Sequence, residues 1–162
     1  MNSEKVYFGA GCFWGVEYYF EKIDGVVSTK VGFMGGSVKN PSYRQVCTEN
    51  TGHVEVVEVK YDTSKVDFLE LAKLFFEIHD MSQFNRQGPD VGLQYRSEVF
   101  FTNQKQKQIV EDLIMYLRQN GFKVLTKLTK ASEFYLAEEY HQRYYFKNGK
   151  SPYCHVRVKK FF

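Results

Sequence analysis

The chain has 162 residues, a length that suits one globular domain with its own hydrophobic core. The net charge is +3 and the basic residues are dispersed, so the charge argues against a nucleic-acid partner. No apolar run is as long as a membrane span, and the first residues lack the pattern of a signal peptide. We therefore expect a cytoplasmic protein without a membrane partner, in which residues 1–162 form a single domain.

Three cysteines occur, at Cys12, Cys47 and Cys154. Their odd number and wide spacing do not suit a disulfide framework. No pair has the C-x-x-C spacing, and no further ligands complete a zinc set around Cys154 and His155. We expect no metal and no cofactor, and thiols that are reactive or buried in a reducing compartment.

Strands and helices alternate in the first half of the chain. Apolar periodicity and closing glycines predict strands over 6–10, 26–32 and 54–61, and helices over 13–22 and 67–78. The glycine-containing stretch over 33–53 is predicted to be a loop.

The second half continues the alternation after a polar, glycine-rich stretch over 80–96. We expect strands over 99–102 and 124–128, a helix that Asn103 caps and Gly121 ends, and a helix over 135–147. A mobile tail is expected over 148–162. The order of elements predicts an α+β two-layer sandwich with a mixed, mostly antiparallel sheet and a ferredoxin-like core of split β-α-β units with long loops.

The segment Gly-Cys-Phe-Trp-Gly at residues 11–15 lies at the predicted turn from the first strand into the first helix. A cysteine at a helix start is close to free N–H groups and to the positive end of the helix dipole, which both stabilise a thiolate. Cys12 is therefore a candidate nucleophile, although a buried structural cysteine would also fit this turn.

The same five residues resemble the signature of the peptide methionine sulfoxide reductase A family. Further segments resemble the family's other motifs and follow in the family's order over nearly the whole chain: 31–36 (Val-Gly-Phe-Met-Gly-Gly), 40–43 (Asn-Pro-Ser-Tyr), 46–48 (Val-Cys-Thr), 51–55 (Thr-Gly-His-Val-Glu), 85–97 (Asn-Arg-Gln-Gly-Pro-Asp-Val-Gly-Leu-Gln-Tyr-Arg-Ser) and 137–142 (Ala-Glu-Glu-Tyr-His-Gln).

The resemblance implies reduction of the S epimer of methionine sulfoxide, free or in peptides and proteins. The Cys12 thiolate would attack the sulfoxide sulfur, and the sulfoxide oxygen must then gain a proton. Glu55 is the candidate acid, because burial at the start of a valine-rich strand would favour its protonated form. The family assigns hydrogen-bond donation to the tyrosines at Tyr43 and Tyr95, and an orienting carboxylate to Asp90.

The family resemblance also implies the remaining parts of the reaction. Phe13 and Trp14 would hold the methyl group of the substrate. Cys12 would become a sulfenic acid, and Cys154 in the tail would resolve it as a disulfide. A thioredoxin-like dithiol would reduce that disulfide. Cys47 is interpreted as a structural thiol, and His53 and His141 as structural residues.

Three departures from the family pattern concern substrate fit and recycling. Phe33 stands where the family usually has tyrosine, residues 81–84 replace a common Pro-Thr-Gln run, and no cysteine follows Cys154. Two other functions remain open on the residues alone. One is a thiol hydrolase or acyltransferase, which would need a Cys–His pair. The other is a non-enzymatic module that binds methionine-containing peptides.

Overall fold

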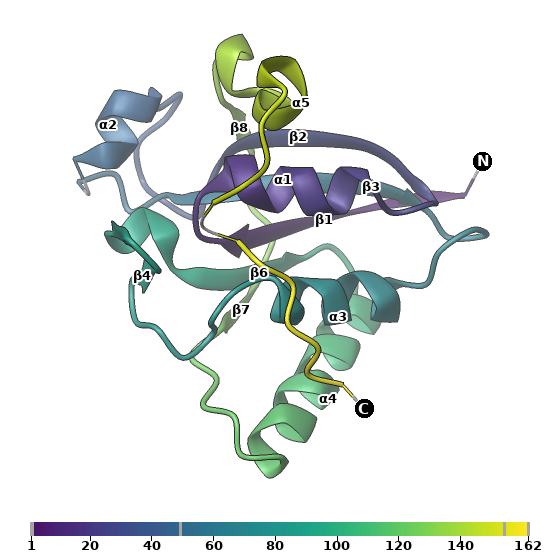
Figure 1. Ribbon diagram of the computed structural model, residues 1–162. Helices are drawn as coiled ribbons and strands as arrows, with labels where there is room; N and C mark the ends of the chain where they lie inside the picture. The colour runs from purple at the N-terminus through teal and green to yellow at the C-terminus, as the bar shows by residue number, and fades with distance from the viewer. Residues whose placement is uncertain (1, 49, 154, 162) are drawn as a thin grey trace.

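The structure, a computed structural model, describes residues 2–48, 50–153 and 155–161. In this part of the chain, six strands form one sheet in the order β7-β6-β1-β3-β2-β8 (Figure 1). The neighbours β6 and β7 are parallel, and the other neighbouring pairs are antiparallel. The strands are β1 (Ser3–Ala10), β2 (Val26–Met34), β3 (Val54–Asp62), β6 (Ser97–Phe101), β7 (Lys127–Lys130) and β8 (Tyr135–Leu136).

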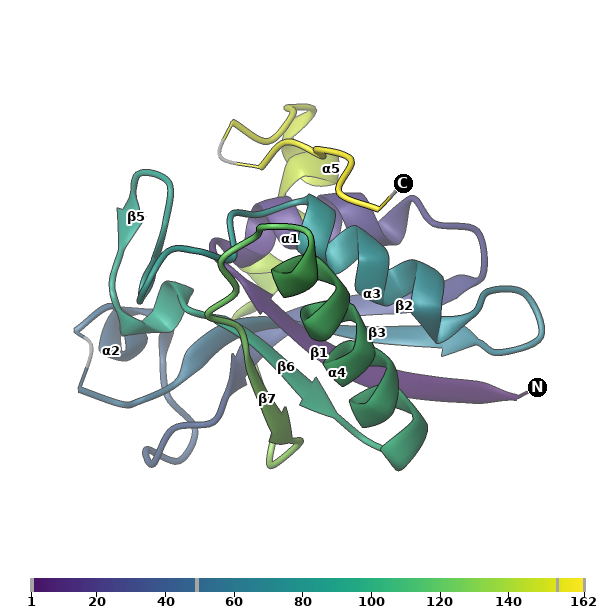
Figure 2. The same cartoon turned by 90° about the horizontal axis from the view of Figure 1, so that it is seen from below.

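Three longer helices cover one face of this sheet: α1 (Phe13–Glu21), α3 (Phe68–Glu77) and α4 (Gln104–Gln119) (Figure 2). The units β1-α1-β2 and β3-α3-β6 each leave room for a strand of the other unit between their two strands, which is the split β-α-β arrangement. The predicted α+β sandwich with a ferredoxin-like core is therefore confirmed. None of the helices in the described residues is both long enough and apolar enough to span a membrane.

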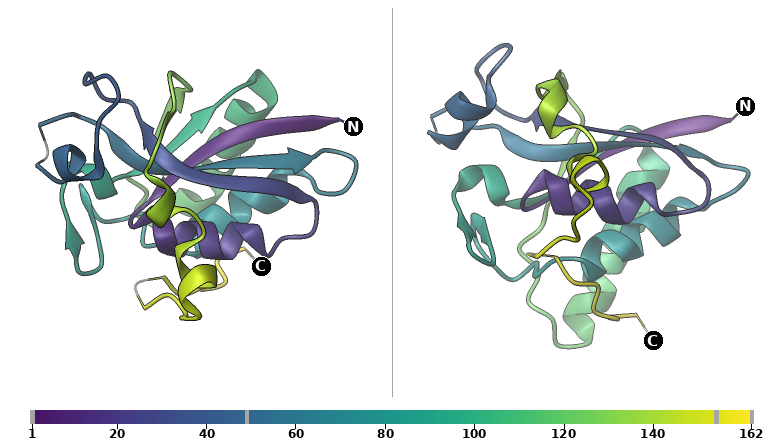
Figure 3. Two further views of the ribbon diagram at one scale, coloured as in Figure 1. Left: turned by 90° about the horizontal axis from the view of Figure 1, so that it is seen from above. Right: turned by 45° about the horizontal axis from the view of Figure 1, so that its top comes forward.

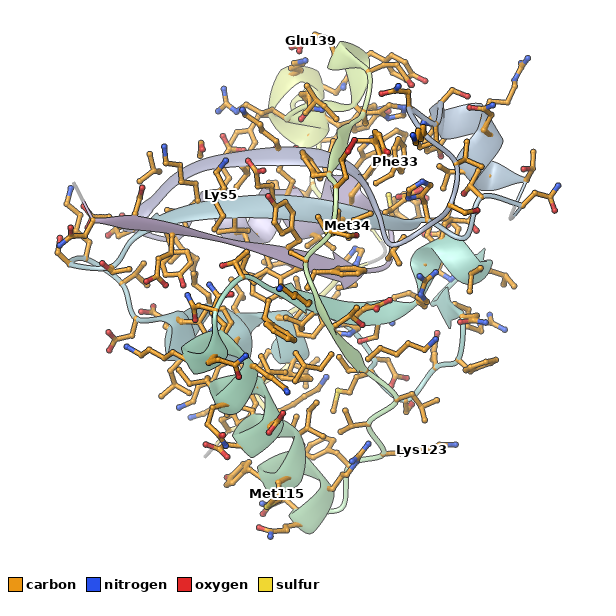
Figure 4. All side chains as sticks on the ribbon, turned by 180° about the vertical axis from the view of Figure 1, so that it is seen from behind. Lys5, Phe33, Met34, Met115, Lys123 and Glu139 are labelled. Atoms are coloured by element: carbon orange, nitrogen blue, oxygen red, sulfur yellow. The ribbon has the colours of Figure 1, made fainter. Side chains whose placement is uncertain are left out.

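The central strand β3 is buried on both faces. Val57 and Val59 pack into the core beneath the helices, whereas Val54 and Val56 join a smaller cluster on the opposite face. A strand covered on both sides needs apolar residues at successive positions, which explains its run of valines. At the end of β2, Phe33 belongs to the first cluster and Met34 to the second; both are labelled in the view from behind the sheet (Figure 4).

Both stretches expected to be loops contain short elements. The stretch over 33–53 includes α2 (Tyr43–Cys47), whose Ser42 cap forms a reciprocal capping box with Gln45. The stretch over 80–96 folds into the hairpin of β4 (Arg86–Gln87) and β5 (Asp90–Val91), followed by the 3-10 helix η1 (Leu93–Tyr95). These local bonds give the segments near the sheet edge a defined shape.

The predicted helix over 135–147 is wrong. Its first residues form β8 on the edge of β2, and the 3-10 helix η2 (Glu139–His141) follows. The Gln142 side chain accepts from the Val31 N–H and donates to the Val31 carbonyl, and Arg143 has a left-handed φ of 52°. A helix, α5 (Tyr144–Asn148), begins only after that residue. Pairing with β2 thus satisfies backbone groups that a continuous helix would have bonded internally.

Four strands have a terminus at the same end of the sheet. In the register of the strands, Ala10 at the end of β1 lies opposite Ser97 at the start of β6, and Met34 at the end of β2 lies opposite Val54 at the start of β3. Figure 1 shows α2 and β4 at this same end, next to the beginning of α1. The loops that carry the predicted functional residues therefore converge here.

Candidate active site

Cys12 lies at the turn from β1 into α1. Gly11 before it has φ of 94°, and a Cβ at that position would come within 2.8 Å of the Gln87 side chain, so glycine is required there. Cys12 is the N-cap of α1, and its carbonyl accepts the first helical bond from Gly15 N–H at 3.2 Å. The partly buried thiol thus lies at the positive end of the helix, which stabilises a thiolate.

Glu55 lies beside the start of the same helix. Its side chain is 1% exposed, and its Oε1 accepts a hydrogen bond from the Phe13 N–H at 3.1 Å. The register of β3 against β2, with Glu55 opposite Phe33, fixes where the carboxyl group enters the site. An acid from β3 and a thiol from the β1–α1 turn, 43 positions apart in the sequence, are thereby brought to one helix N-terminus.

Tyr43 and Tyr95 come from different segments but share this environment. Burial raises the pKa of each phenol well above its ordinary value, and the nearby Glu55 carboxyl group raises both further when it is ionised. Tyr95 is also within electrostatic reach of Asp90 and Cys12. The two phenols therefore stay protonated and can donate hydrogen bonds over a wide pH range.

Asp90 opens β5 of the hairpin and is paired in register with Gln87. Its charge contributes to the raised pKa of Tyr95, after burial and Glu55. The hairpin thus brings Asp90 near the Tyr95 phenol, on the side of the site formed by residues 85–97.

Phe13 and Trp14 belong to an aromatic cluster centred on His141. Phe13 is fully buried, and the ring of Tyr43 lies 4.4 Å from that of His141 between centroids. Trp14 remains partly exposed; its Nε1–H donates to His141 Nδ1 at 3.0 Å, and its ring stacks on Tyr144 at 3.8 Å. The neutral His141 with a proton on Nε2 fits this bond, and burial lowers the pKa of His141.

The sequence interpretation did not consider Tyr144, and it treated His141 and Cys47 as structural residues; the structure places all three beside the predicted site residues. His141 falls in the Ala-Glu-Glu-Tyr-His-Gln segment, whose resemblance to the family was a usable signal. Cys47 is exposed at the end of α2, and its sulfur accepts a hydrogen bond from the Tyr43 hydroxyl. Partial desolvation raises the pKa of the Cys47 thiol, and the bond from Tyr43 opposes that shift.

His53 has a structural position in the loop after β2. Its Nδ1 accepts from the Gly36 N–H at 3.0 Å and its Nε2 donates to the Val38 carbonyl at 2.7 Å. The predicted resolving residue Cys154 lies outside the described residues. Among the residues that are described, no three His, Cys, Asp or Glu side chains are grouped as a metal site would require.

A thiol at a helix start, a buried carboxyl beside it and two neutral phenols are the parts of a thiol-dependent reductase that delivers a proton to an oxygen atom. Residues 4–162 match the family described as peptide methionine sulfoxide reductase. The chain belongs to this family.

Relatives from other organisms match almost the whole chain. It is 48% identical to the peptide methionine sulfoxide reductase MsrA of Sulfolobus acidocaldarius, covering 94% of this chain and 90% of that protein. It is 51% identical to the MsrA of Methanothermobacter thermautotrophicus, covering 91% and 89%.

Solved structures agree with the fold. Reduced Mxr1 from Saccharomyces cerevisiae superposes with a TM-score of 0.88 at 34% identity, covering 96% of this chain and 92% of that one. Methionine sulfoxide reductase A of Corynebacterium diphtheriae gives 0.82 at 41% identity, covering 93% and 78%.

Proposed function

We propose that the chain reduces methionine S-sulfoxide, free or in peptides and proteins, to methionine, and that Cys12 is the nucleophile. The enzyme is a peptide-methionine sulfoxide reductase. The observation that supports the mechanism is the bond from the Phe13 N–H to the buried Glu55, because it holds the carboxyl group at the helix start that bears Cys12, where an acid would reach the oxygen of a bound sulfoxide.

In the first step the Cys12 thiolate attacks the sulfoxide sulfur. Glu55 gives a proton to the sulfoxide oxygen, and Tyr43 and Tyr95 stabilise that oxygen by donating hydrogen bonds. The oxygen passes to Cys12 as a sulfenic acid, so the cysteine is oxidised by two electrons and the substrate sulfur is reduced by two. Asp90 orients Tyr95 through its charge.

The substrate methyl group contacts the aromatic cluster. The partly exposed Trp14 offers the contact surface, and the buried Phe13 packs with it around His141. The hydrogen bond to His141 and the stack on Tyr144 hold the indole in place. A preformed apolar surface favours a thioether over a charged side chain.

Recycling needs a second thiol, and we assign that role to Cys154. Its thiolate attacks the sulfur of the Cys12 sulfenic acid, a Cys12–Cys154 disulfide forms, and water leaves. A thioredoxin-like dithiol then reduces the disulfide by exchange. Yeast Mxr1, which resembles this chain, has been solved in complex with Trx2. A reducing compartment such as the cytoplasm would supply this reductant.

Two variants test the assignment. Cys12→Ser is expected to abolish reduction of the sulfoxide, with dithiothreitol as reductant. Cys154→Ser is expected to allow one turnover and to lose thioredoxin-driven cycling, whereas the control Cys47→Ser keeps both. Full activity of Cys12→Ser would refute the nucleophile, and a Cys12–Cys47 bridge found by mass spectrometry would refute the resolver.

A further inference from the structure

The C-terminal segment is attached to the helix that begins at Cys12. Figures 2 and 3 show it passing α1 and continuing beside α3. His155 is 1% exposed, and its Nε2–H donates to the Ala10 carbonyl at 2.7 Å. Ala10 is the last residue of β1, two positions before Cys12. A residue near the end of the chain thus binds directly to the strand that presents the nucleophile.

Gly15 provides the space for this histidine. A Cβ atom on Gly15 would lie only 2.3 Å from His155 Nδ1, and one on Gly11 would lie 3.3 Å from Nε2. The imidazole therefore fits against the bare backbone of the first turn of α1. Both glycines of the Gly-Cys-Phe-Trp-Gly segment face the same ring.

The main chain around His155 is held as well. The Tyr19 hydroxyl donates to the His155 carbonyl at 3.1 Å. Five residues earlier, the Lys150 N–H donates to the Tyr145 carbonyl of α5 at 3.2 Å. Hydrogen bonds thus hold the main chain at residues 150 and 155, on either side of a short segment.

We propose that His155 is a positioning residue that keeps the thiol of its sequence neighbour Cys154 within reach of Cys12. This inference rests on the proposed function, in which Cys154 resolves the sulfenic acid. His155 takes no part in the bond changes; it restricts the segment in which the resolving thiol is covalently placed. Gly15 is the receiving surface and Tyr19 the second point of attachment.

The size of the effect follows from the next point of attachment. Beyond His155, the Arg157 side chain bonds Glu77 Oε1 at 3.0 Å, and the main chain is next held where the Val158 N–H donates to the Glu77 carbonyl on α3 at 2.7 Å. Without the imidazole, residue 155 keeps only the Tyr19 bond to its carbonyl. When that bond opens, the span between main-chain attachments grows from residues 150–155 to residues 150–158. Effective concentration falls roughly as the −3/2 power of length, which gives about a 2-fold loss. Lost orientation raises the expected loss to about 10-fold.

The test separates the two chemical steps in His155→Ala. Reduced enzyme is mixed with a peptide containing methionine sulfoxide and no other reductant, then quenched at intervals. Methionine release reports the first step, and alkylation with mass spectrometry reports the Cys12–Cys154 disulfide. We expect unchanged methionine release and disulfide formation slowed by about 2-fold to 10-fold. Disulfide formation at the wild-type rate, or faster, would overturn the proposal.

Two further variants guard against a general loss of structure. Tyr19→Phe removes only the hydroxyl donor and is expected to slow the same step by less than His155→Ala does. Val156→Ala changes the exposed neighbour and is the matched control, with both steps unchanged. If His155→Ala does not fold, the proposal stands or falls on whether Tyr19→Phe slows disulfide formation.

Cys154→Ser distinguishes the proposal from the function on which it rests. If that variant still closes a disulfide on Cys12 at the wild-type rate, the resolver is wrong and the role of His155 falls with it. If Cys154→Ser blocks the disulfide while His155→Ala and Tyr19→Phe leave its rate unchanged, only the positioning role is refuted.

Discussion

Tyr43 and Tyr95 differ from charged donors in how they can serve a developing oxyanion. Their pKa values are raised by burial and then by Glu55, so they donate hydrogen bonds without adding a positive charge that would pair with Glu55. A neutral donor in a desolvated site is effective because it replaces water with a fixed dipole. Both phenols also interact electrostatically with Glu55. If one hydroxyl is removed, the other can still donate a hydrogen bond near Glu55.

We expect Tyr43→Phe and Tyr95→Phe each to lower kcat about 10-fold, and the double variant to lose more than either. The measurement is reduction of methionine sulfoxide under saturating dithiothreitol. In the proposed function the substrate is bound mainly by the aromatic surface, so KM should change little. A double variant with wild-type kcat would remove both phenols from the mechanism.

His141 makes a separate residue-scale prediction. His141→Phe keeps a ring for packing but removes the acceptor for the Trp14 Nε1–H, a bond of 3.0 Å. The lost hydrogen bond contributes about 1 kcal/mol to holding Trp14 in its orientation. Its loss should raise KM about 5-fold, with a smaller effect on kcat. Tyr144→Phe keeps the stack on Trp14 and is the matched control, with KM unchanged. Equal KM values for His141→Phe and wild type would contradict the role of His141.

At this scale the sequence predicted the helix-start position of Cys12, because strand, glycine and helix signals are all local. It did not predict His141 as the centre of the aromatic cluster. That role depends on η2 lying against α1, and the two are separated by more than a hundred residues. The position of Cys47 beside Tyr43 was not predicted for a related reason, since both belong to α2, which forms inside a stretch expected to be a loop.

At the scale of elements, α1 connects Cys12 and the C-terminal segment through Gly15. Gly15→Ala would normally stabilise a helix by up to about 1 kcal/mol. Here the new methyl group would overlap the buried His155 ring, so we expect a net destabilisation of about 1 to 3 kcal/mol. Urea unfolding measures the change.

The same substitution in a His155→Ala background should be neutral or stabilising, because the overlapping ring is gone. The double-mutant cycle would then give a coupling of at least about 1 kcal/mol between the two positions. Additive effects of Gly15→Ala and His155→Ala would show that the ring does not occupy this space.

Predicted elements were accurate where local signals decided them. The helix α4 begins after Asn103, whose side chain accepts from the Gln106 N–H, and it ends just before Gly121 with φ of 90°. The segment over 135–147 was wrongly predicted because its partners are distant. Its backbone pairs with β2, and the side-chain amide of Gln142 bonds to the Val31 backbone of that strand. No pattern within the segment indicates either contact.

At the scale of the whole molecule, His79 connects parts of the chain through a buried hydrogen-bonded chain. Its Nδ1–H donates to the Phe75 carbonyl of α3, and its Nε2 accepts from Ser97 of β6, both at 2.7 Å. Ser97 in turn is bonded to Thr126 before β7 at 2.7 Å. Because the Ser97 proton is directed to His79, Thr126 is the donor in that last bond.

Burial lowers the pKa of His79 from its ordinary value of 6.5 to about 3. Between pH 6.5 and about 3, His79 therefore binds a proton in the unfolded chain but not in the folded chain. The neutral, buried His79 therefore does not reduce the free energy of unfolding above pH 6.5. As the pH falls from 6.5 toward 3, His79 lowers the free energy of unfolding by at most about 1.4 kcal/mol per pH unit. Urea unfolding at a series of pH values measures the decline.

His79→Gln is the control, since glutamine can donate and accept but does not titrate. Its free energy of unfolding should be lower at neutral pH yet less dependent on pH between 6.5 and 3. Carboxyl groups contribute equally to both proteins, so the difference between the two curves isolates His79. Parallel curves would show that His79 binds a proton as readily in the folded chain as in the unfolded chain.

The overall architecture was predictable because two β-α-β units with these lengths lead to a split arrangement of strands. Which loops meet at one edge of the sheet was not predictable from spacing alone. Glu55 and Cys12 come together only through the register of β3 between β1 and β2. The family motifs nevertheless predicted that Cys12 and Glu55 act at one site, because one motif contains Cys12 and another contains Glu55.

Trp14 is the only tryptophan in the chain, and it lies in the aromatic cluster beside the thiol. The ultraviolet-excited emission of the indole therefore arises from one position, next to the reacting sulfur. If the reaction runs as proposed, changes in that emission would report substrate binding, sulfur oxidation and disulfide formation without an attached dye. The side chain proposed to contact the substrate would thus serve as a built-in fluorescent probe of each stage.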